Sequence, residues 1–380
     1  QLLKPDLDWK KLYRLIQRER TAGPMWRFLE PVRGQLHGEF SRRLKRAAAV
    51  EGLRQRQLLE KLETSVEALH AAGVTPLLLK GAALVLTCYD DVRQRPMADI
   101  DLLVSPGEAE RAREVLLECG WASARKTYPR EMYERHYHQP PLVDERRTGI
   151  ELEVHTGLLV PGHPFAFGPE DLRHRSREAE CGEATALVPE PRDHLLYLCL
   201  HFAWGHSLGS AGWRTFRDVG VLTAADAFRW PDFLQAAREA RAEPAAYWTL
   251  WLARDLGRSE MPDHVLDDLR PAVPDSLVRL LQSHYAFNLF TDAGCPSVRI
   301  RNLMWVAGNE WGYRRDEPVP KERAVRPWEF SGYFEPMQQT VGPADMGFAK
   351  LRRHLGEAGR WRDYLRRVLF SPGERERSAR

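Results

Sequence analysis

The sequence predicts an α+β fold in which a small mixed β-sheet is flanked by helices from both ends of the chain. Helical periodicity of apolar residues dominates the first 70 residues and returns after about residue 190. Between these regions, short apolar runs alternate with polar breaks, as short strands and helices do. We therefore expect an N-terminal helical segment (1–72), a core that contains the sheet (73–190), a C-terminal helical region (191–373) and a charged tail (374–380).

The N-terminal segment is predicted to be helical. Trp9, Leu12 and Ile16 recur at helical spacing, and a periodic apolar stripe runs from Leu36 to His70. Gly73 is expected to end this helix, because glycine readily adopts the left-handed conformation of a C-terminal cap.

The core is predicted to contain several short elements. Strands are expected over 74–79, 99–104 and 121–128, with a break at Lys80-Gly81 before a helix over 82–89, and another helix from Ser105-Pro106 to Cys119. Two more strands, over 133–143 and 149–156, should pair through the polar turn 144–148. After Pro189 the helical pattern includes segments over 231–256 and 274–289.

Composition indicates a globular protein and argues against some classes of partner. Of the 380 residues, 43% are hydrophobic and 29% are charged, which is sufficient for a sizeable core. The net charge of +3 argues against a dedicated nucleic-acid or polybasic membrane binder. No apolar run reaches the roughly 20 residues of a membrane span. The five scattered cysteines suit a reducing compartment, so we expect a cytoplasmic protein without a membrane partner.

Acidic residues share one face of two predicted strands. Because side chains alternate along a strand, Asp99 and Asp101 point the same way. The same rule groups Glu151, Glu153 and His155. If the strands are neighbours, their carboxylates converge, and such like charges persist only with a cation or ample water around them. Clustered oxygen ligands suit Mg²⁺ or Mn²⁺ and phosphoryl-transfer chemistry. The alternative is a pair of half-exposed strands whose acids simply face water.

Residues around the break at Lys80-Gly81 favour the functional interpretation. A strand that runs through a small residue into a helix N-terminus presents free N–H groups to an anion, with Lys80 beside them. Arg95 can pair with phosphate, or be an ordinary surface arginine. His155 can orient a carboxylate, or be a structural histidine. His136 and His138 share a strand face, but with no third ligand nearby in the sequence we do not expect a zinc site.

Three runs of the sequence carry a resemblance to a known family. They are Leu77-Leu-Leu-Lys-Gly-Ala-Ala-Leu84, Tyr89-Asp-Asp and Arg95-Pro-Met-Ala-Asp-Ile-Asp-Leu-Leu-Val104. Together they resemble the signature of the uncharacterised nucleotidyltransferase family of the polymerase-beta-like nucleotidyltransferase superfamily, and the resemblance extends over most of the chain. Glu153-Val-His155 falls where that family has an acidic residue followed two later by histidine. Two features depart from the superfamily pattern: Gly81-Ala82 replaces Gly-Ser or Gly-Gly, and the turn precedes Asp99 by eighteen residues, which is longer than the norm.

The resemblance implies roles for these residues. Asp99 and Asp101 would be paired metal ligands and Glu153 the third carboxylate, while Gly81 with Ala82 would cradle a nucleoside triphosphate. The implied reaction is Mg²⁺- or Mn²⁺-dependent transfer of NMP from an NTP to an acceptor, with release of pyrophosphate. The near-neutral charge favours a small molecule, peptide or protein over a long nucleic acid as the acceptor.

The sequence leaves two further interpretations open. The first is a catalytically silent relative that binds a nucleotide or a partner protein. The second is a two-metal phosphodiesterase, which would release nucleotide by attack of water. Glu151 and His155 are candidates for supporting the metal ligands in the enzymatic interpretations.

Overall fold

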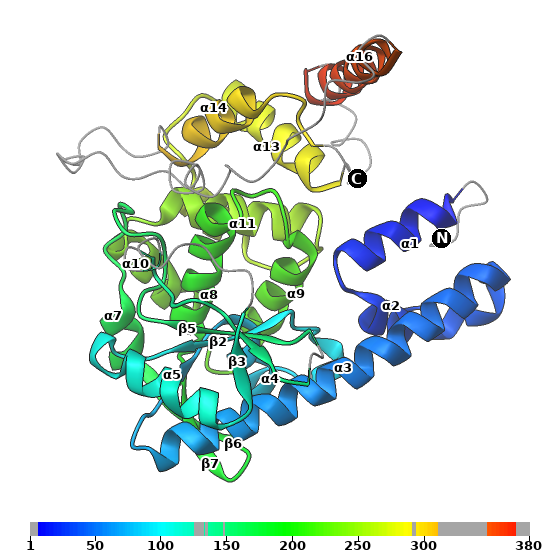
Figure 1. The fold of residues 1–380 in the computed structure, drawn as a ribbon. Coiled ribbons are helices and arrows are strands. Elements are labelled where there is room, and N and C mark those ends of the chain that lie inside the picture. The colour runs from blue at the N-terminus through cyan, green and yellow to red at the C-terminus, as the bar shows by residue number, and fades with distance from the viewer. Residues whose placement is uncertain are drawn as a thin grey trace. The chain divides into compact units, whose positions relative to one another are not determined.

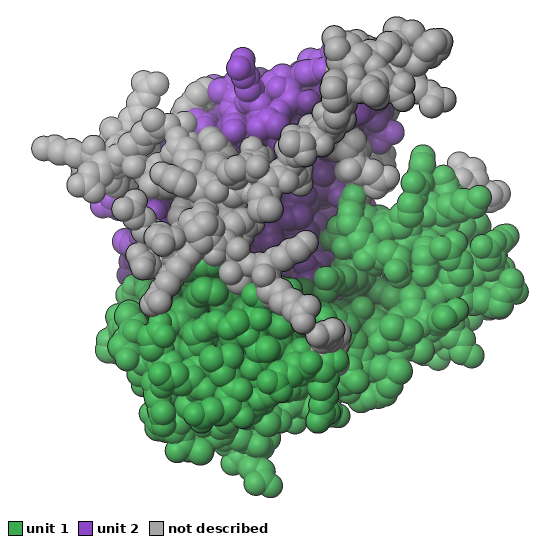
Figure 2. Space-filling model, viewed as in Figure 1, with its two compact units in different colours: residues 1–158, 167–194, 224–228 green, residues 159–166, 195–223, 229–380 purple. Residues whose placement is uncertain are grey.

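The structure, a computed structural model (Figure 1), describes residues 7–124, 133, 136–146, 149–290, 294–310 and 348–369. The chain divides into two compact units, coloured separately in Figure 2. Unit 1 comprises residues 1–158, 167–194 and 224–228, and it contains every strand of the sheet. Unit 2 comprises residues 159–166, 195–223 and 229–380, and its described secondary-structure elements are helices. The α+β fold class is confirmed, whereas the boundaries at 72/73 and 190/191 stay predictions.

The N-terminal segment is helical, as the sequence predicts. Its elements are α1 (Trp9–Arg18), α2 (Ala22–Phe28), the 3₁₀ helix η1 (Glu30–Gln35) and α3 (Gly38–Ala71). Asp8 caps α1 by accepting hydrogen bonds from the backbone N–H groups of Lys10 and Lys11. Gly73 follows α3 with φ +78°, which confirms its role in ending that helix.

Helix α3, the long helix in Figure 1, contributes residues to two separate apolar clusters. Phe40 and Leu44, near its N-terminal end, pack with residues of α1 and α2. Leu58, Leu62 and Val66, toward its C-terminal end, belong to the core that contains the sheet. The single helix α3 thus packs against the N-terminal helices at one end and against the core of the sheet at the other.

The sheet of unit 1 is small and mixed. Its strands are β1 (Leu77–Leu78), β2 (Asp99–Leu103), β3 (Trp121–Ser123), β4 (Leu142–Asp144), β5 (Glu151–His155), β6 (Ser176–Cys181) and β7 (Ala184–Pro189). They lie in the order β3-β4-β5-β2-β1-β7-β6. The pairs β2–β5 and β1–β7 are parallel, and the other neighbouring pairs are antiparallel.

The core lies against one face of the two central strands. Ile100, Leu102, Leu152 and Val154 are buried and belong to the same apolar cluster as the C-terminal half of α3. Because side chains alternate along a strand, Asp101 must therefore point to the opposite face. The alternation read from the sequence is confirmed for both strands.

Several element boundaries differ from those predicted. Helix α4 (Lys80–Thr87) includes the residues expected to form a break, with Lys80 itself in the left-handed region at φ +48°. Among the residues of the predicted strand 133–143 that the structure describes, the last two belong to β4, and His138 makes an isolated bridge to His155. The strand predicted over 121–128 is β3, which ends at Ser123, and residues 125–128 lie outside the described residues.

The rest of unit 1 includes one helix that was predicted and three elements that were not. The helix predicted from Ser105-Pro106 is a 3₁₀ turn, η3 (Pro106–Glu108), followed by α5 (Ala109–Glu118). A capping box between Ser105 and Glu108 fixes its start. Helix α7 (Pro169–His174) and the β6–β7 hairpin were not predicted. A 3₁₀ turn, η2 (Val92–Gln94), lies in the loop before β2.

Helices follow β7. They are α8 (Pro191–Leu200), the π-helix η4 (His201–Gly205), α9 (Gly212–Thr223), α10 (Trp230–Glu239), α11 (Glu243–Asp255), α12 (Asp263–Asp268), α13 (Asp275–Phe290), α14 (Val298–Asn309) and α16 (Phe348–Leu369). The segment predicted to be helical over 231–256 forms two helices, α10 and α11, which are separated around Arg241, whose φ is +55°. Pro244 lies in the first turn of α11, where its missing N–H costs no hydrogen bond of the helix, so a new helix can begin there. The predicted tail 374–380 lies outside the described residues. Among the described helices, none combines the length and apolar character needed to cross a membrane.

Unit 2 contains a buried histidine held between α13 and α16. Asn288 Nδ2 donates a hydrogen bond to His284 Nε2 over 2.9 Å, so His284 Nδ1 carries the proton and donates to Tyr364 Oη over 2.9 Å. The side-chain oxygen of Asn288, Oδ1, accepts a hydrogen bond from the backbone N–H of Cys295, which fixes the orientation of the Asn288 side-chain amide. Burial, together with the nearby positive charge of Arg301, lowers the pKa of His284 to about 3.

Acidification should therefore weaken unit 2 through His284. The folded-state pKa is about 3 and the unfolded value is 6.5, so the unfolded chain binds the extra proton as pH falls. This stabilisation is complete above pH 6.5 and declines as pH falls toward 3. We expect His284 to account for a loss of about 2 kcal/mol in the free energy of unfolding between pH 7 and pH 5. Urea unfolding of the wild type and of His284→Gln at both pH values checks this, because the variant should lose that much less; equal losses would contradict it.

Candidate active site

Two neighbouring strands bring acidic side chains to one face of the sheet. Strands β2 and β5 pair in parallel, with Asp99 opposite Glu151 and Asp101 opposite Glu153. Residues paired across a sheet point to the same side. The conditional prediction that these strands are neighbours is thus confirmed, and the acids share a face.

Two of these acids and a histidine form a compact group. Within the described residues, Asp101, Glu153 and His155 have potential metal-ligand atoms within 4.8 Å of one another. His155 Nε2 lies 2.9 Å from Asp101 Oδ1 and 3.3 Å from Glu153 Oε2. Asp101 and His155 are buried, whereas Glu153 is half-buried and reaches solvent. The group can hold a cation through two carboxylates and an imidazole.

Lys80 completes the surroundings of Asp101. Its ammonium lies 3.0 Å from Asp101 Oδ1, the same oxygen that accepts a hydrogen bond from His155 Nε2. Burial alone would raise the pKa of Asp101, but Lys80 and the bond from His155 outweigh it and hold that pKa well below its ordinary value. Asp101 is therefore an anion at every physiological pH, and a cation that binds it competes with Lys80 and His155.

The two carboxylates also act on His155. Burial opposes charge on the imidazole, yet hydrogen bonds to Asp101 and Glu153 raise the pKa of His155 above its ordinary value. Its Nδ1 is buried and has no hydrogen-bond partner among the described residues. Burial alone would raise the pKa of Glu153, but the hydrogen bond from His155 outweighs it, so the pKa of Glu153 lies below its ordinary value. We infer that Nε2 carries the proton that joins His155 to the carboxylates.

A second histidine segment lies against the same group. His138 Nε2 is 3.8 Å from Glu153 Oε2, and its ring centroid is 5.3 Å from that of His155. The His136 and His138 rings are in edge contact at 4.0 Å. Burial lowers the pKa of both, to about 3 for His136. The sequence interpretation set these histidines apart because no third ligand was near them, although the predicted pairing of 133–143 with 149–156 already placed them beside β5.

The start of α4 lies beside the loop that leads to β2. A Cβ at Gly81 would lie 2.9 Å from Met97 Cγ and 3.5 Å from a terminal guanidinium nitrogen of Arg95. Arg95 is buried and donates a hydrogen bond to the Pro96 carbonyl over 2.8 Å. The structure thus brings together Gly81 and Arg95, two residues expected to bind a nucleotide.

Gly81→Ala should destabilise the protein, because its methyl group would meet Met97 inside a packed core. Overpacking of this kind lowers the free energy of unfolding by about 1–3 kcal/mol, which exceeds the helix-propensity gain of alanine. The matched control is Gly107→Ala, since nothing lies within 4 Å of a Cβ at that position. Urea unfolding compares the two, and equal stability of both variants would contradict the close approach at Gly81.

The remaining predicted site residues lie at the margin of this group. Asp99 is half-buried at the start of β2, outside the compact group found among the described residues, and Glu151 is exposed. Ala82 is buried, and its N–H donates to the Leu79 carbonyl over 3.1 Å. Of the four acids, Asp101 and Glu153 are therefore the two that belong to the compact group with His155.

Helix α3 holds both acidic strands at their beginnings, through residues that the sequence analysis did not single out. The Arg54 guanidinium donates to the carbonyls of Met97 and Ala98 over 2.9 Å each, and to that of Gly149 over 3.0 Å. Buried Gln55 donates to the Met97 carbonyl and accepts from its N–H. These bonds fix the segments that precede β2 and β5, and with them the relative positions of their acids.

Arg54→Met should loosen both segments, because three carbonyls lose a charged donor. Hydrogen bonds to charged groups contribute about 1.5–3 kcal/mol each, and we expect a loss at the upper end of that range because the three share one side chain. Hydrogen exchange of the amides of β2 and β5 should accelerate. The control is Arg56→Met, an exposed arginine on the same helix. Unchanged exchange in Arg54→Met would show that α3 does not hold these strands.

A buried histidine also supports the start of α4. His194 of α8 is almost completely buried and hydrogen-bonds to the backbone of Lys80, whose left-handed conformation is unusual for a residue with a side chain. Burial lowers the pKa of His194 to about 3, although the bond to Lys80 opposes this. Neutral His194 therefore helps to hold Lys80 in the conformation that directs its ammonium to Asp101. No sequence signal marked His194, because a polar residue in the first turns of an otherwise apolar helix is common.

Comparison with known proteins agrees with this geometry. A model of the family described as uncharacterised nucleotidyltransferase matches residues 5–258 of the chain. The match includes every strand of the sheet and every residue of the acidic group. No curated protein and no solved structure matches the sequence significantly. Because the match covers well over half of the 380 residues, the chain belongs to this uncharacterised nucleotidyltransferase family, which supports a general role in nucleotidyl transfer.

Proposed function

We propose that the protein is a metal-dependent enzyme of the polymerase-beta-like type that moves NMP from an NTP to a small molecule, peptide or protein. The observation that carries the proposal is the parallel register of β2 and β5, which sets Asp101 opposite Glu153. The Lys80-Gly81 turn lies beside these acids through the contact of Lys80 with Asp101. Family membership supports the same reaction class.

The ligand set fits Mg²⁺ or Mn²⁺. Asp101 and Glu153 offer carboxylate oxygens, and Asp99 lies on the same face one strand repeat away. His155 adds Nε2 as a ligand once the cation displaces the proton that this nitrogen shares with the carboxylates, and Mn²⁺ accepts such a nitrogen more readily than Mg²⁺ does. When bound, such an ion neutralises charge on the triphosphate and on the leaving pyrophosphate.

The residues around the turn are proposed to bind the triphosphate. Gly81 allows the close approach of Arg95, whose guanidinium is suited to bidentate pairing with phosphate oxygens. Lys80 directly precedes Gly81 and forms an ion pair with Asp101, and its ammonium supplies a further positive charge near the turn. The N–H of Ala82 is bonded to Leu79 here, so backbone contacts to phosphate would need this first turn to adjust.

Glu153 is the proposed acceptor of the proton that the attacking group loses. It is the member of the group that reaches solvent, whereas Asp101 is buried and bonded on one oxygen by both Lys80 and His155. His155 hydrogen-bonds to the Glu153 carboxylate and orients it, and the His138 ring lies 3.8 Å from the same oxygen. Glu151 is exposed and stays a candidate for outer support only.

The direct experiment is incubation with each α-labelled NTP, Mg²⁺ or Mn²⁺, and an extract of the cells from which the protein comes. Label that becomes covalently attached to an acceptor supports the proposal. Release of labelled nucleotide without a labelled acceptor would favour a phosphodiesterase.

The pairing of Asp101 with Lys80 and His155 favours one second candidate, a silent member of the fold that binds nucleotide or a partner. Such a protein needs no divalent cation at this group, since Lys80 already neutralises Asp101. Calorimetry separates the two, because tight NTP binding without a divalent cation, together with no transfer of label, would identify the binder.

A further inference from the structure

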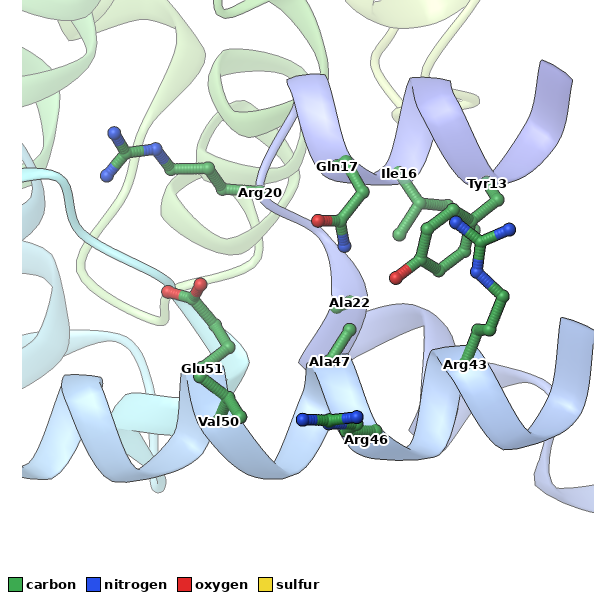
Figure 3. A pocket seen from close by; sticks show the side chains of 10 residues that line it. All are labelled: Tyr13, Ile16, Gln17, Arg20, Ala22, Arg43, Arg46, Ala47, Val50 and Glu51. Carbon is green, nitrogen blue, oxygen red and sulfur yellow. The ribbon is translucent and has the colours of Figure 1, made fainter. Parts of the chain in front are cut away.

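We propose that a pocket between α1, α2 and α3 of unit 1 binds a small anionic molecule that carries a flat ring. The pocket has a volume of about 410 Å³, within the usual size of small-molecule sites (Figure 3). Its lining residues come from the N-terminal helices, and none of them belongs to the acidic group of the sheet. The proposal does not depend on the proposed function.

Charge is the first property that selects the ligand. The lining includes three arginines, Arg20, Arg43 and Arg46, against one acid, Glu51. Glu51 Oε1 already accepts a hydrogen bond from Gln55 over 2.6 Å, which stabilises it without neutralising a guanidinium. The excess of guanidinium groups favours an anion, and the planar fork of arginine suits phosphate or carboxylate.

The position of Arg43 is partly fixed before any ligand arrives. Its guanidinium carbon lies 4.3 Å from the centroid of the Tyr13 ring, as a cation–π pair. Its ion pair with Glu39, at 3.8 Å, is exposed and therefore weak. An anion that binds Arg43 displaces little, and the guanidinium is already oriented on the ring.

The shape and polarity of the pocket favour a ligand that carries a flat ring. Figure 3 shows the side chains of Tyr13 and Gln17 pointing from α1 toward α3, where Ala22 and Ala47 leave room between the helices. Ile16, also in the lining, is buried and apolar. A floor of small apolar side chains beside an aromatic ring accommodates a planar group, while Gln17 offers both a hydrogen-bond donor and an acceptor.

The test uses the full chain and three probes in equilibrium dialysis: AMP, adenosine and inorganic phosphate. EDTA is present throughout, so that metal-dependent binding of nucleotide at the acidic group does not contribute. We expect AMP to bind more tightly than either adenosine or phosphate. If adenosine binds as tightly as AMP, the ligand does not need a negative charge. If phosphate binds as tightly as AMP, the ligand does not need a flat ring. Either result contradicts the proposal.

Variants locate the binding. Arg43→Gln and Arg46→Gln should each weaken AMP binding roughly tenfold, as loss of a charge-assisted hydrogen bond does. Ala47→Leu should abolish it by filling the pocket while leaving every charge in place. Arg42→Gln, an exposed arginine of the same helix outside the lining, should bind as the wild type does. The proposal is overturned if the wild type binds no AMP, if Ala47→Leu still binds it, or if Arg42→Gln weakens binding as much as Arg46→Gln.

Discussion

Asp101→Asn should lower the transfer of label from an α-labelled NTP by at least ~100-fold, because even outer partners of metal-binding side chains reduce metal affinity or activity 10–100-fold when mutated. The asparagine keeps the shape of the side chain, and its carbonyl oxygen can still accept from Lys80 and His155. What it loses is the charge that attracts a divalent cation. The fold should therefore survive, and circular dichroism together with urea unfolding checks this.

The matched control is Glu178→Gln, which removes an exposed acid from another strand of the same sheet. It should transfer label as the wild type does. Calorimetric titration with Mn²⁺ adds a readout that needs no acceptor: Asp101→Asn should bind Mn²⁺ far more weakly than the control. Transfer retained by folded Asp101→Asn would reject the assignment of Asp101 as a metal ligand.

The shared face of the acids could be predicted because it depends only on strand alternation. Asp99 and Asp101 on one strand, and Glu153 and His155 on the other, need no tertiary information to be placed on common sides. That the two strands are neighbours was supported by the resemblance to a family, and the structure then supplied the register. A local signal also sufficed for the end of α3 at Gly73, where a single residue with positive φ decides how the helix ends.

The supporting residues could not be predicted, because they act across long stretches of chain. Arg54 bonds to Ala98 and Gly149, which lie 44 and 95 residues away, and an arginine on a helix carries no sign of such partners. His194 bonds to the backbone of Lys80 from another helix altogether. The close approach of Met97 to Gly81, in the first turn of α4, is likewise a tertiary contact between segments that the sequence alone does not bring together.

The pairing of Lys80 with Asp101 leads to a second large effect. The Lys80 side chain is only 16% exposed and Asp101 is almost fully buried. Removal of one partner leaves an uncompensated buried charge, so Lys80→Met should lower the free energy of unfolding by ~3–5 kcal/mol. Urea unfolding in EDTA measures this loss. A loss below ~1 kcal/mol would show that the pair behaves as an exposed salt bridge.

A divalent cation should reverse much of that loss, since Asp101 and Glu153 can bind it through carboxylate oxygens and His155 can join them by releasing its Nε2 proton. A ligand present at 100 times its Kd stabilises the folded state by about 2.7 kcal/mol. The matched control is Lys61→Met, because Lys61 pairs at 2.7 Å with another buried acid, Asp144, which is not part of the acid–histidine group found among the described residues. Lys61→Met should be destabilised as well, but Mn²⁺ should not restore it. If Mn²⁺ stabilises both variants equally, or neither, then Asp101, Glu153 and His155 are not a metal centre, and Lys80 is a structural partner of Asp101 alone.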